Sequence, residues 1–169
     1  MSTSSNNIAQ RAGFFRRLAA MIYDCLIAVA IAMLSGLVIV TFLVVLFEQN
    51  IIANHGYQHA NEFLQQSLLY KIVVQGWVLL WVSVFFLWFW KNGGQTLGMR
   101  AWRLRIYTLD ENQHMGYGRL FIRLVASLCG LGTLLVLFDF KNKQSLQDRI
   151  VGTEMLLLSK DENHHKSWR

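Results

Sequence analysis

The chain has 169 residues, of which 54% are hydrophobic and 15% are charged, whereas about 25% of residues are charged in an average soluble domain. These values favour a single domain of an integral membrane protein. The formal net charge of +6 does not indicate a nucleic-acid-binding protein, because the basic residues flank apolar runs; we therefore expect anionic lipid headgroups as the partner and no nucleic acid.

Residues 1–13 are polar and are predicted to be disordered. Residues 18–47 then pass almost without charge, and an apolar run of this length predicts a membrane-spanning helix. No small-residue cleavage site ends the run, so we expect it to remain as an anchor and not to be removed as a signal peptide. Arg17 and Asp24 share one helical face, with Arg17 at the headgroups and Asp24 inside the hydrocarbon.

A second apolar run covers residues 68–90 and predicts a second membrane-spanning helix. It ends in Phe-Leu-Trp-Phe-Trp, and such a tryptophan cluster is typical of a membrane boundary. The connection over residues 48–67 contains neither lysine nor arginine, which places it on the outer side under the positive-inside rule. His55, His59 and Glu62 in this connection are too few for a metal site, so we expect solvated side chains and no metal.

A glycine-rich segment from Asn92 to Arg100 follows the second run. It does not end in Gly-Lys-Ser or Gly-Lys-Thr and therefore does not predict a phosphate-binding loop. In residues 102–107 apolar residues alternate with arginines, and this period of two predicts a β-strand. A second strand is predicted over residues 153–158, so we expect a small cytoplasmic two-stranded β element.

The third apolar run, residues 120–138, contains Arg123 and is interrupted by Gly130-Leu131-Gly132. The positive-inside rule places the N-terminus and residues 91–119 in the cytoplasm. A plain third crossing is the default interpretation, although it leaves a basic C-terminal tail on the outer side. The alternative is a re-entrant hairpin that turns at the glycines, because pairing of the two predicted strands would hold both ends of the run on one side.

Asp24 and Arg123 are the ionisable residues inside the predicted membrane segments, where an unpaired charge is costly. Either they form a structural ion pair, or Asp24 is a proton or cation site that exchanges its ligand during transport. No nucleophile with a base, no paired carboxylates and no metal-ligand set accompanies them, so we expect neither an enzyme nor a cofactor. Cys25 and Cys129 lie in apolar runs without CxxC spacing and do not predict a disulfide framework.

Several of these motifs together resemble the RDD family of small bacterial membrane proteins. Arg17 and Asp24 match the arginine and the aspartate of the family's first helix. Asp148, in Gln-Asp-Arg-Ile-Val-Gly-Thr, resembles the family's second aspartate in the pattern His-Asp-Arg-Leu-Ala-Gly-Thr. The glycine-rich segment and the region around Arg123 have counterparts in the same order, and the resemblance covers residues 11–158.

Two positions depart from the family pattern: Gln147 replaces the usual histidine before the aspartate, and Met99 stands where lysine is common. If that histidine handles protons in the family, this chain lacks the group. For function, the resemblance implies only what has been suggested for some members, which is transport, including cation/proton antiport.

We therefore predict an all-α membrane protein of the bacterial inner membrane with a cytoplasmic N-terminus and a small β element. The membrane domain, residues 14–158, is expected to contain three segments, and a polar tail over residues 159–169 follows it. The predicted membrane segments are about 18–47, 68–90 and 120–138.

The charged residues Arg17, Asp24, Arg123 and Asp148 are expected to form one polar seam that joins the first helix to the third run. The expected function is that of a small transporter, such as a cation/proton antiporter that works as a homo-oligomer, with the transported ion as its partner. The alternative is a non-catalytic membrane adaptor or assembly factor, which binds another protein and uses the ion pair only to hold its fold.

Overall fold

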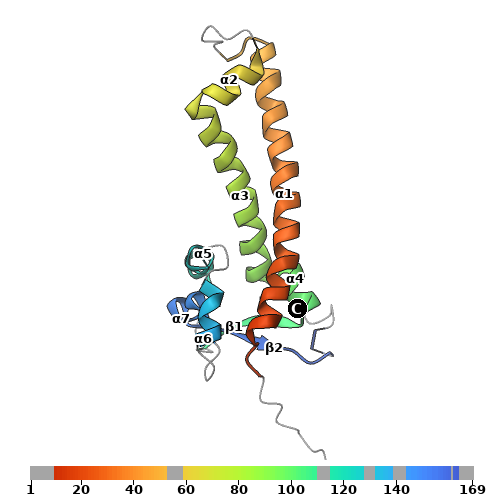
Figure 1. Ribbon diagram of the computed structural model, residues 1–169, viewed down its shortest axis with the longest axis vertical. Coiled ribbons are helices and arrows are strands. Elements are labelled where there is room, and N and C mark those ends of the chain that lie inside the picture. Colours follow the sequence, from red (N-terminus) through yellow and green to blue (C-terminus); the bar gives the residue numbers. More distant parts are fainter. Residues whose placement is uncertain are drawn as a thin grey trace, which may run out of the picture. The chain divides into compact units, whose positions relative to one another are not determined.

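The computed structural model describes residues 10–52, 59–109, 115–127, 132–138, 144–160 and 162–163. It is mostly helical and divides into two compact units. The hairpin unit is Leu26–Phe85, and the composite unit combines Met1–Cys25 with Phe86–Arg169. Two long helices, α1 (Phe14–Glu48) and α3 (Leu68–Gly93), contribute residues to both units (Figure 1).

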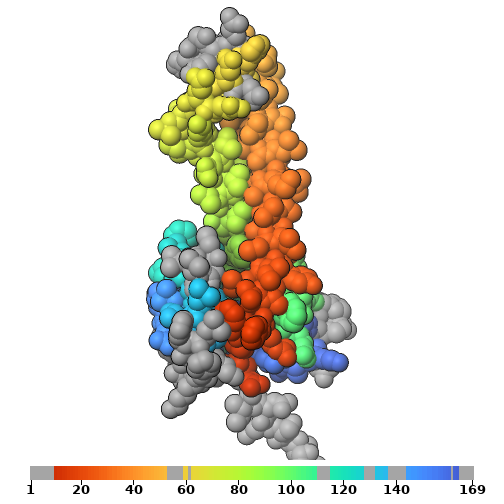
Figure 2. Space-filling view, viewed as in Figure 1, coloured from red at the N-terminus to blue at the C-terminus, as the bar shows by residue number. Residues whose placement is uncertain are grey.

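Within the hairpin unit, α1 and α3 lie side by side and are connected through the short helix α2 (Ala60–Gln66) (Figures 1 and 2). Gly36 of α1 faces Val78 of α3, and a Cβ atom built at position 36 would lie in ordinary contact with Val78, 3.6 Å from its Cγ2. At the connected end of the unit, the rings of Phe47 and Phe63 lie 5.1 Å apart and form a small buried cluster with Ala60.

Both long helices have the length and composition needed to cross a membrane. They contain 35 and 26 residues, and about 20 helical residues are enough for the hydrocarbon layer. Residues 25–47 and 72–90 contain no Asp, Glu, Lys, Arg or His. Large apolar side chains such as Met33, Leu34 and Leu79 are more than 60% exposed, as expected for helices whose surroundings are lipid.

The third predicted segment is not one long helix in the described residues. It contains α5 (Tyr117–Ala126), a single helical turn at residues 132–134 and α6 (Leu135–Phe138). Residues 128–131, which include most of the predicted glycine turn, lie outside the described part of the chain. A third membrane-spanning helix is therefore not confirmed.

The composite unit contains the two predicted strands as an antiparallel pair, β1 (Leu104–Thr108) and β2 (Thr153–Leu157). This confirms the β element, with Leu104 opposite Leu157 and Thr108 opposite Thr153. The first strand starts two residues later than predicted, because α4 (Leu97–Ala101) precedes it and Arg103 then adopts a positive φ of 57°.

The segment before α1 lies along the outer edge of β2. The Ala12 amide donates to the Met155 carbonyl at 2.9 Å, and the Leu157 amide donates to the Gln10 carbonyl at the same distance. The predicted disorder of residues 1–13 is therefore wrong for residues 10–12, which pair with β2; residues 1–9 lie outside the described part. An edge strand offers unpaired backbone groups, and this contact satisfies them.

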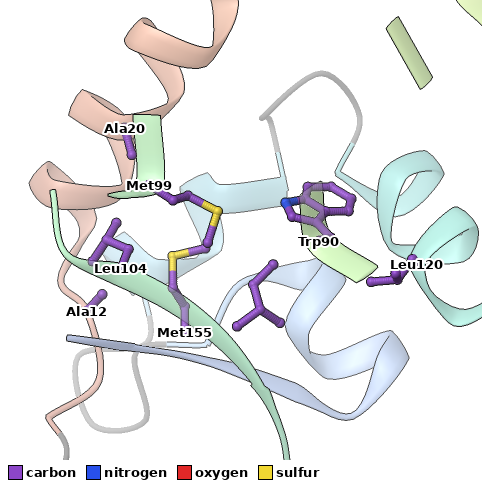
Figure 3. Close-up of a cluster of buried hydrophobic side chains, with 8 residues drawn as sticks. Ala12, Ala20, Trp90, Met99, Leu104, Leu120 and Met155 are labelled. Atoms are coloured by element: carbon purple, nitrogen blue, oxygen red, sulfur yellow. The ribbon is translucent and has the colours of Figure 1, made fainter. Parts of the chain in front are cut away.

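The hydrophobic core of the composite unit is formed by residues from both of its sequence segments, before residue 26 and after residue 85 (Figure 3). Met99 and Met155 point toward one another in this core, and their flexible side chains fill the space between helices and sheet. The eight buried residues are Ala12, Ala20, Trp90, Met99, Leu104, Ile106, Leu120 and Met155.

Helix α5 packs against α7 (Leu146–Val151), and α7 leads directly into β2. The two ends of the third apolar run consequently lie in the same unit. Pairing of the two strands predicted this arrangement, whereas a plain third crossing would separate the two ends.

Candidate functional site

The side chain of Arg17, in the first turn of α1, is directed at Asp148 of α7. Its Nη1 donates to Asp148 Oδ2 at 2.5 Å, and its Nε donates to the Ala12 carbonyl at 3.1 Å. The side chains of Arg17 and Asp148 are 2% and 0% exposed. The contact joins two residues that are 131 positions apart in the sequence.

A second arginine, Arg123 of α5, binds the other oxygen of the same carboxylate. Its Nη1 donates to Asp148 Oδ1 at 2.7 Å and also to the hydroxyl of Thr153 at the start of β2. Asp148 occupies this position because it is the third residue of α7, where it and Ser145 form a reciprocal capping box. We call these five residues the Asp148 cluster: Arg17, Arg123, Ser145, Asp148 and Thr153.

The Asp148 cluster contains two positive charges and one negative charge in a buried site. The Arg123 guanidinium also lies 5.6 Å from the centre of the Trp90 ring, and this cation–π contact partly offsets its desolvation. Removal of one partner from a buried ion pair leaves an uncompensated charge and typically costs 3–5 kcal/mol. The cluster therefore links α1, α5 and α7 in a way that does not tolerate loss of the shared carboxylate.

Burial by itself would raise the pKa of Asp148, but the positive charges of Arg123 and Arg17 and the hydrogen bonds lower that pKa from 3.8 to about 2. A carboxyl with a lowered pKa in the folded state stabilises the fold above its unfolded pKa, and this contribution disappears as the pH falls through the folded pKa. We expect the free energy of unfolding to lose about 2 kcal/mol between about pH 4 and pH 2 from this group.

Thermal unfolding of the detergent-solubilised protein across this pH range measures the loss. The control is Asp148→Asn, which has no carboxyl at this position and should show a correspondingly flatter pH dependence. Equal slopes for the two proteins would show that Asp148 does not titrate in this way.

Asp24 of α1 has different partners, which come from the glycine-rich segment. Its Oδ2 accepts from the Thr96 hydroxyl at 2.5 Å, and its Oδ1 accepts from the Gly98 amide at 2.9 Å. Thr96 is also the N-cap of α4 and accepts from the Met99 amide at 3.2 Å. The carboxylate therefore binds the start of α4 through uncharged donors, and its side chain is buried.

Gly98 allows this approach. A Cβ atom built at position 98 would lie 2.3 Å from the Ala20 carbonyl oxygen and 2.8 Å from Asp24 Oδ1. Any side chain at this position would therefore separate α4 from α1. The glycine has a packing role that its place in a glycine-rich segment did not by itself reveal.

The expectation of one seam with an Asp24–Arg123 pair is wrong. Arg17, Arg123 and Asp148 come together, whereas both oxygens of Asp24 accept hydrogen bonds from Thr96 and Gly98. Asp148 belongs to the first turn of α7, where Ser145 is the N-cap, and its side chain is fully buried.

Sequence reasoning did not identify four partners of Asp24 and Asp148, although the sequence contains a capping pattern for two of them. Ser145 stands three residues before Asp148, which is the spacing of a capping box, and Thr96 precedes a short helix as an N-cap. The other two, Gly98 and Thr153, had no such signal, because their role depends on segments distant in the sequence.

The two departures from the family pattern have defined places in the composite unit. Gln147 is buried, and its amide Nε2 donates to the Thr133 hydroxyl at 3.1 Å, which connects α7 to the turn before α6. Met99 is part of the apolar core. A lysine could not take the place of Met99 without bringing a charge into that core.

No group of three His, Cys, Asp or Glu side chains suited to a metal ion occurs in the part of the chain that the structure describes. Of the three residues of the outer connection that were expected to be solvated and not to bind a metal, His59 and Glu62 belong to that part, and His55 lies outside it. Cys25 is a free, exposed thiol on α1, and Cys129 lies outside the described residues.

The model of the RDD family matches residues 11–152, which is most of the chain. The matched range includes Asp24 and four of the five members of the Asp148 cluster; Thr153 lies just outside it. No curated protein and no solved structure matches the chain significantly.

Proposed function

Because the chain belongs to the RDD family, we propose that it is a multi-pass inner-membrane protein that exchanges a small cation for protons. The family and the two apolar helices indicate a membrane protein, and the direction of transport, the ion and the membrane are parts of the proposal. In this proposal the N-terminus and the composite unit lie in the cytoplasm. The positive-inside rule supports this orientation, since Arg11 precedes α1, Arg16 and Arg17 lie in its first turn, and the outer connection has neither Lys nor Arg.

The observation that carries the transport proposal is the environment of Asp24. It is a buried carboxyl in a long apolar helix, and both of its oxygens accept hydrogen bonds from uncharged donors. Among the described residues no Lys or Arg forms an ion pair with Asp24, so its charged form is not held by a fixed cation and it is suited to bind and release a proton.

Protonation of Asp24 would change its contact with α4. A backbone amide is only a donor, so a proton on Oδ1 would oppose the bond from Gly98. The Thr96 hydroxyl is both donor and acceptor, so it can turn and accept a proton carried on Oδ2. The bond from the Gly98 amide to Oδ1 then loses its negatively charged acceptor and weakens. We propose that the protonation state of Asp24 controls how tightly α4 is held against α1, which would couple proton binding to a structural change.

A transport pathway needs more than one copy of the chain. The long helices carry no charged residue over 25–47 and 72–90, and two helices are too few to enclose a polar path. We therefore propose a homo-oligomer in which the pathway lies between copies. Ser35, Thr41, Gln75 and Ser83 are polar side chains available to line it.

The test is cation-driven proton flux in inverted membrane vesicles that contain the protein at matched abundance. We expect Asp24→Asn to reduce the flux to the background of empty vesicles, because asparagine cannot exchange a proton at this position. The matched control is Glu62→Gln, which removes an exposed carboxyl of α2 and should leave the flux unchanged.

Absence of flux with Na⁺, K⁺ and Li⁺, while the parent and Asp24→Asn are both stably inserted, would contradict antiport. Flux that persists in Asp24→Asn would contradict the role of Asp24 and would show that transport does not depend on this residue.

The second candidate is a non-catalytic membrane adaptor or assembly factor, and one feature of the hairpin unit favours it. An open groove of about 510 Å³ lies between α1, α2 and α3, and its walls are mostly apolar with a few polar side chains. Such a groove would suit an apolar segment of a partner protein. The polar residues in its wall are Gln65, Tyr70, Lys71 and Gln75.

A further inference from the structure

Helix α5 has its apolar and polar sides reversed relative to a helix of a water-soluble domain. Arg123 is buried on its inner side together with Leu120. Phe121, Ile122 and Val125 on its outer side are each more than 50% exposed. A surface helix in water buries its apolar stripe and exposes its charges, so the surroundings of this face are not expected to be water.

The exposed side chains of α5 form one continuous face. Tyr117, Phe121 and Val125 follow each other at intervals of four, and Ile122 lies beside them, so all of them project from the same side of the helix. We call these four residues the α5 face. Ile150 on the adjacent helix α7 is also more than 50% exposed.

The start of α5 is connected to the end of a membrane-spanning helix. Lys91, in the last turn of α3, donates from Nζ to the Met115 carbonyl at 2.9 Å and lies 5.7 Å from the centre of the Tyr117 ring. Lysine, tyrosine and tryptophan at helix ends typically mark the level of the headgroups, and the exposed Trp88 lies one turn before Lys91. The α5 face therefore begins where α3 reaches the membrane surface.

The charge of the composite unit fits an anionic surface. Apart from the buried Arg17, Arg123, Asp24 and Asp148, its described residues include nine Lys and Arg against two Glu, whereas the described part of the hairpin unit has one Lys and two Glu. The positive charge thus gathers in the unit that carries the α5 face. Basic side chains near a membrane are attracted to its anionic lipids, and each is worth about 1 kcal/mol on average.

We propose that the α5 face lies in the headgroup region of the membrane that α1 and α3 cross, and that the surrounding basic residues select anionic phospholipids there. In this arrangement α5 runs along the surface of the bilayer and does not cross it. The proposal depends on residence in a membrane and does not depend on transport.

The test is spin-label accessibility in the full chain, reconstituted into vesicles of phosphatidylcholine with phosphatidylglycerol. Both native cysteines are first replaced by serine, and one label is placed with Val125→Cys on the α5 face. The matched control is Lys160→Cys, at an exposed site after β2 in the same unit. Collision with oxygen, which dissolves in lipid, is compared with collision with a water-soluble nickel chelate.

We expect oxygen collisions to exceed nickel collisions several-fold at position 125, and the opposite order at position 160. Omission of phosphatidylglycerol should raise nickel access at position 125 while the label at position 160 is unchanged. This result would support both the insertion of the face and its preference for anionic lipid.

Three results would overturn the proposal. Equal nickel access at both positions would show that water covers the α5 face. Spectral broadening at position 125 that disappears on dilution with unlabelled protein would show that a second copy covers it. An unchanged signal without phosphatidylglycerol would exclude the selection of anionic lipid.

Discussion

The substitution Asp148→Asn is expected to lower the free energy of unfolding by about 3–5 kcal/mol, which is a large part of the stability of a domain of this size. Asparagine keeps the shape of the side chain but removes its charge. The guanidinium groups of Arg17 and Arg123 would then remain buried together without an anion. The loss of stability is measured by heating the solubilised protein and determining, by size-exclusion chromatography, the fraction that remains folded.

Glu154→Gln is the matched control for this prediction. It removes another carboxylate that binds an arginine in the same unit, since Glu154 Oε2 accepts from Arg11 Nε at 2.8 Å. These side chains are 20% and 32% exposed, so solvent screens the pair and we expect a loss of about 1 kcal/mol or less. Similar losses for the two variants would mean that the burial of the Asp148 cluster is not what makes it strong.

The substitution Gly98→Ala is expected to destabilise the composite unit by about 1–3 kcal/mol and to detach α4 from Asp24. The added methyl group would meet the Ala20 carbonyl oxygen at 2.3 Å, and a backbone atom cannot turn away as a side chain does. Unfolding is measured as for Asp148. In vesicles, the variant should also lose the proton flux assigned to Asp24, because the Gly98 amide would no longer reach its carboxylate.

Gly118→Ala separates this steric effect from the general effect of alanine. A Cβ atom at position 118 meets no atom within 4 Å, and the residue lies in helix α5. Alanine favours a helix over glycine by up to about 1 kcal/mol, so we expect no loss of stability from this control. An unaffected Gly98→Ala would contradict the close contact between α4 and Asp24.

The two long helices were predictable because lipid imposes a simple requirement. A spanning helix needs enough apolar residues to cover the hydrocarbon layer, and residues 18–47 and 68–90 satisfy this by composition alone. The observed helices extend these limits to Phe14–Glu48 and Leu68–Gly93. The third run is not confirmed as a crossing, because composition does not distinguish a crossing helix from a shorter apolar helix such as α5, whose Arg123 binds the buried Asp148.

The strands were predictable from alternation, and both ends of the third run lie in the same unit as the pair that these strands form. A period of two identifies a strand locally. The register between Leu104 and Leu157 depends on the whole chain between them. The bonds of residues 10–13 to β2 had no sequence signal at all, since a short polar segment becomes ordered only when an unpaired strand edge is available.

The sequence by itself determined that this is a membrane protein of the RDD family, with Arg17, Asp24, Arg123 and Asp148 as its notable charges. Only the tertiary structure decided the partners of those charges. The physical reason is that a buried charge is stabilised by groups within a few ångströms, and here these groups come from distant segments: 131 positions separate Arg17 from Asp148, and 72 separate Asp24 from Thr96. Local patterns specify helices and strands, whereas the pairing of buried charges follows from how those elements pack.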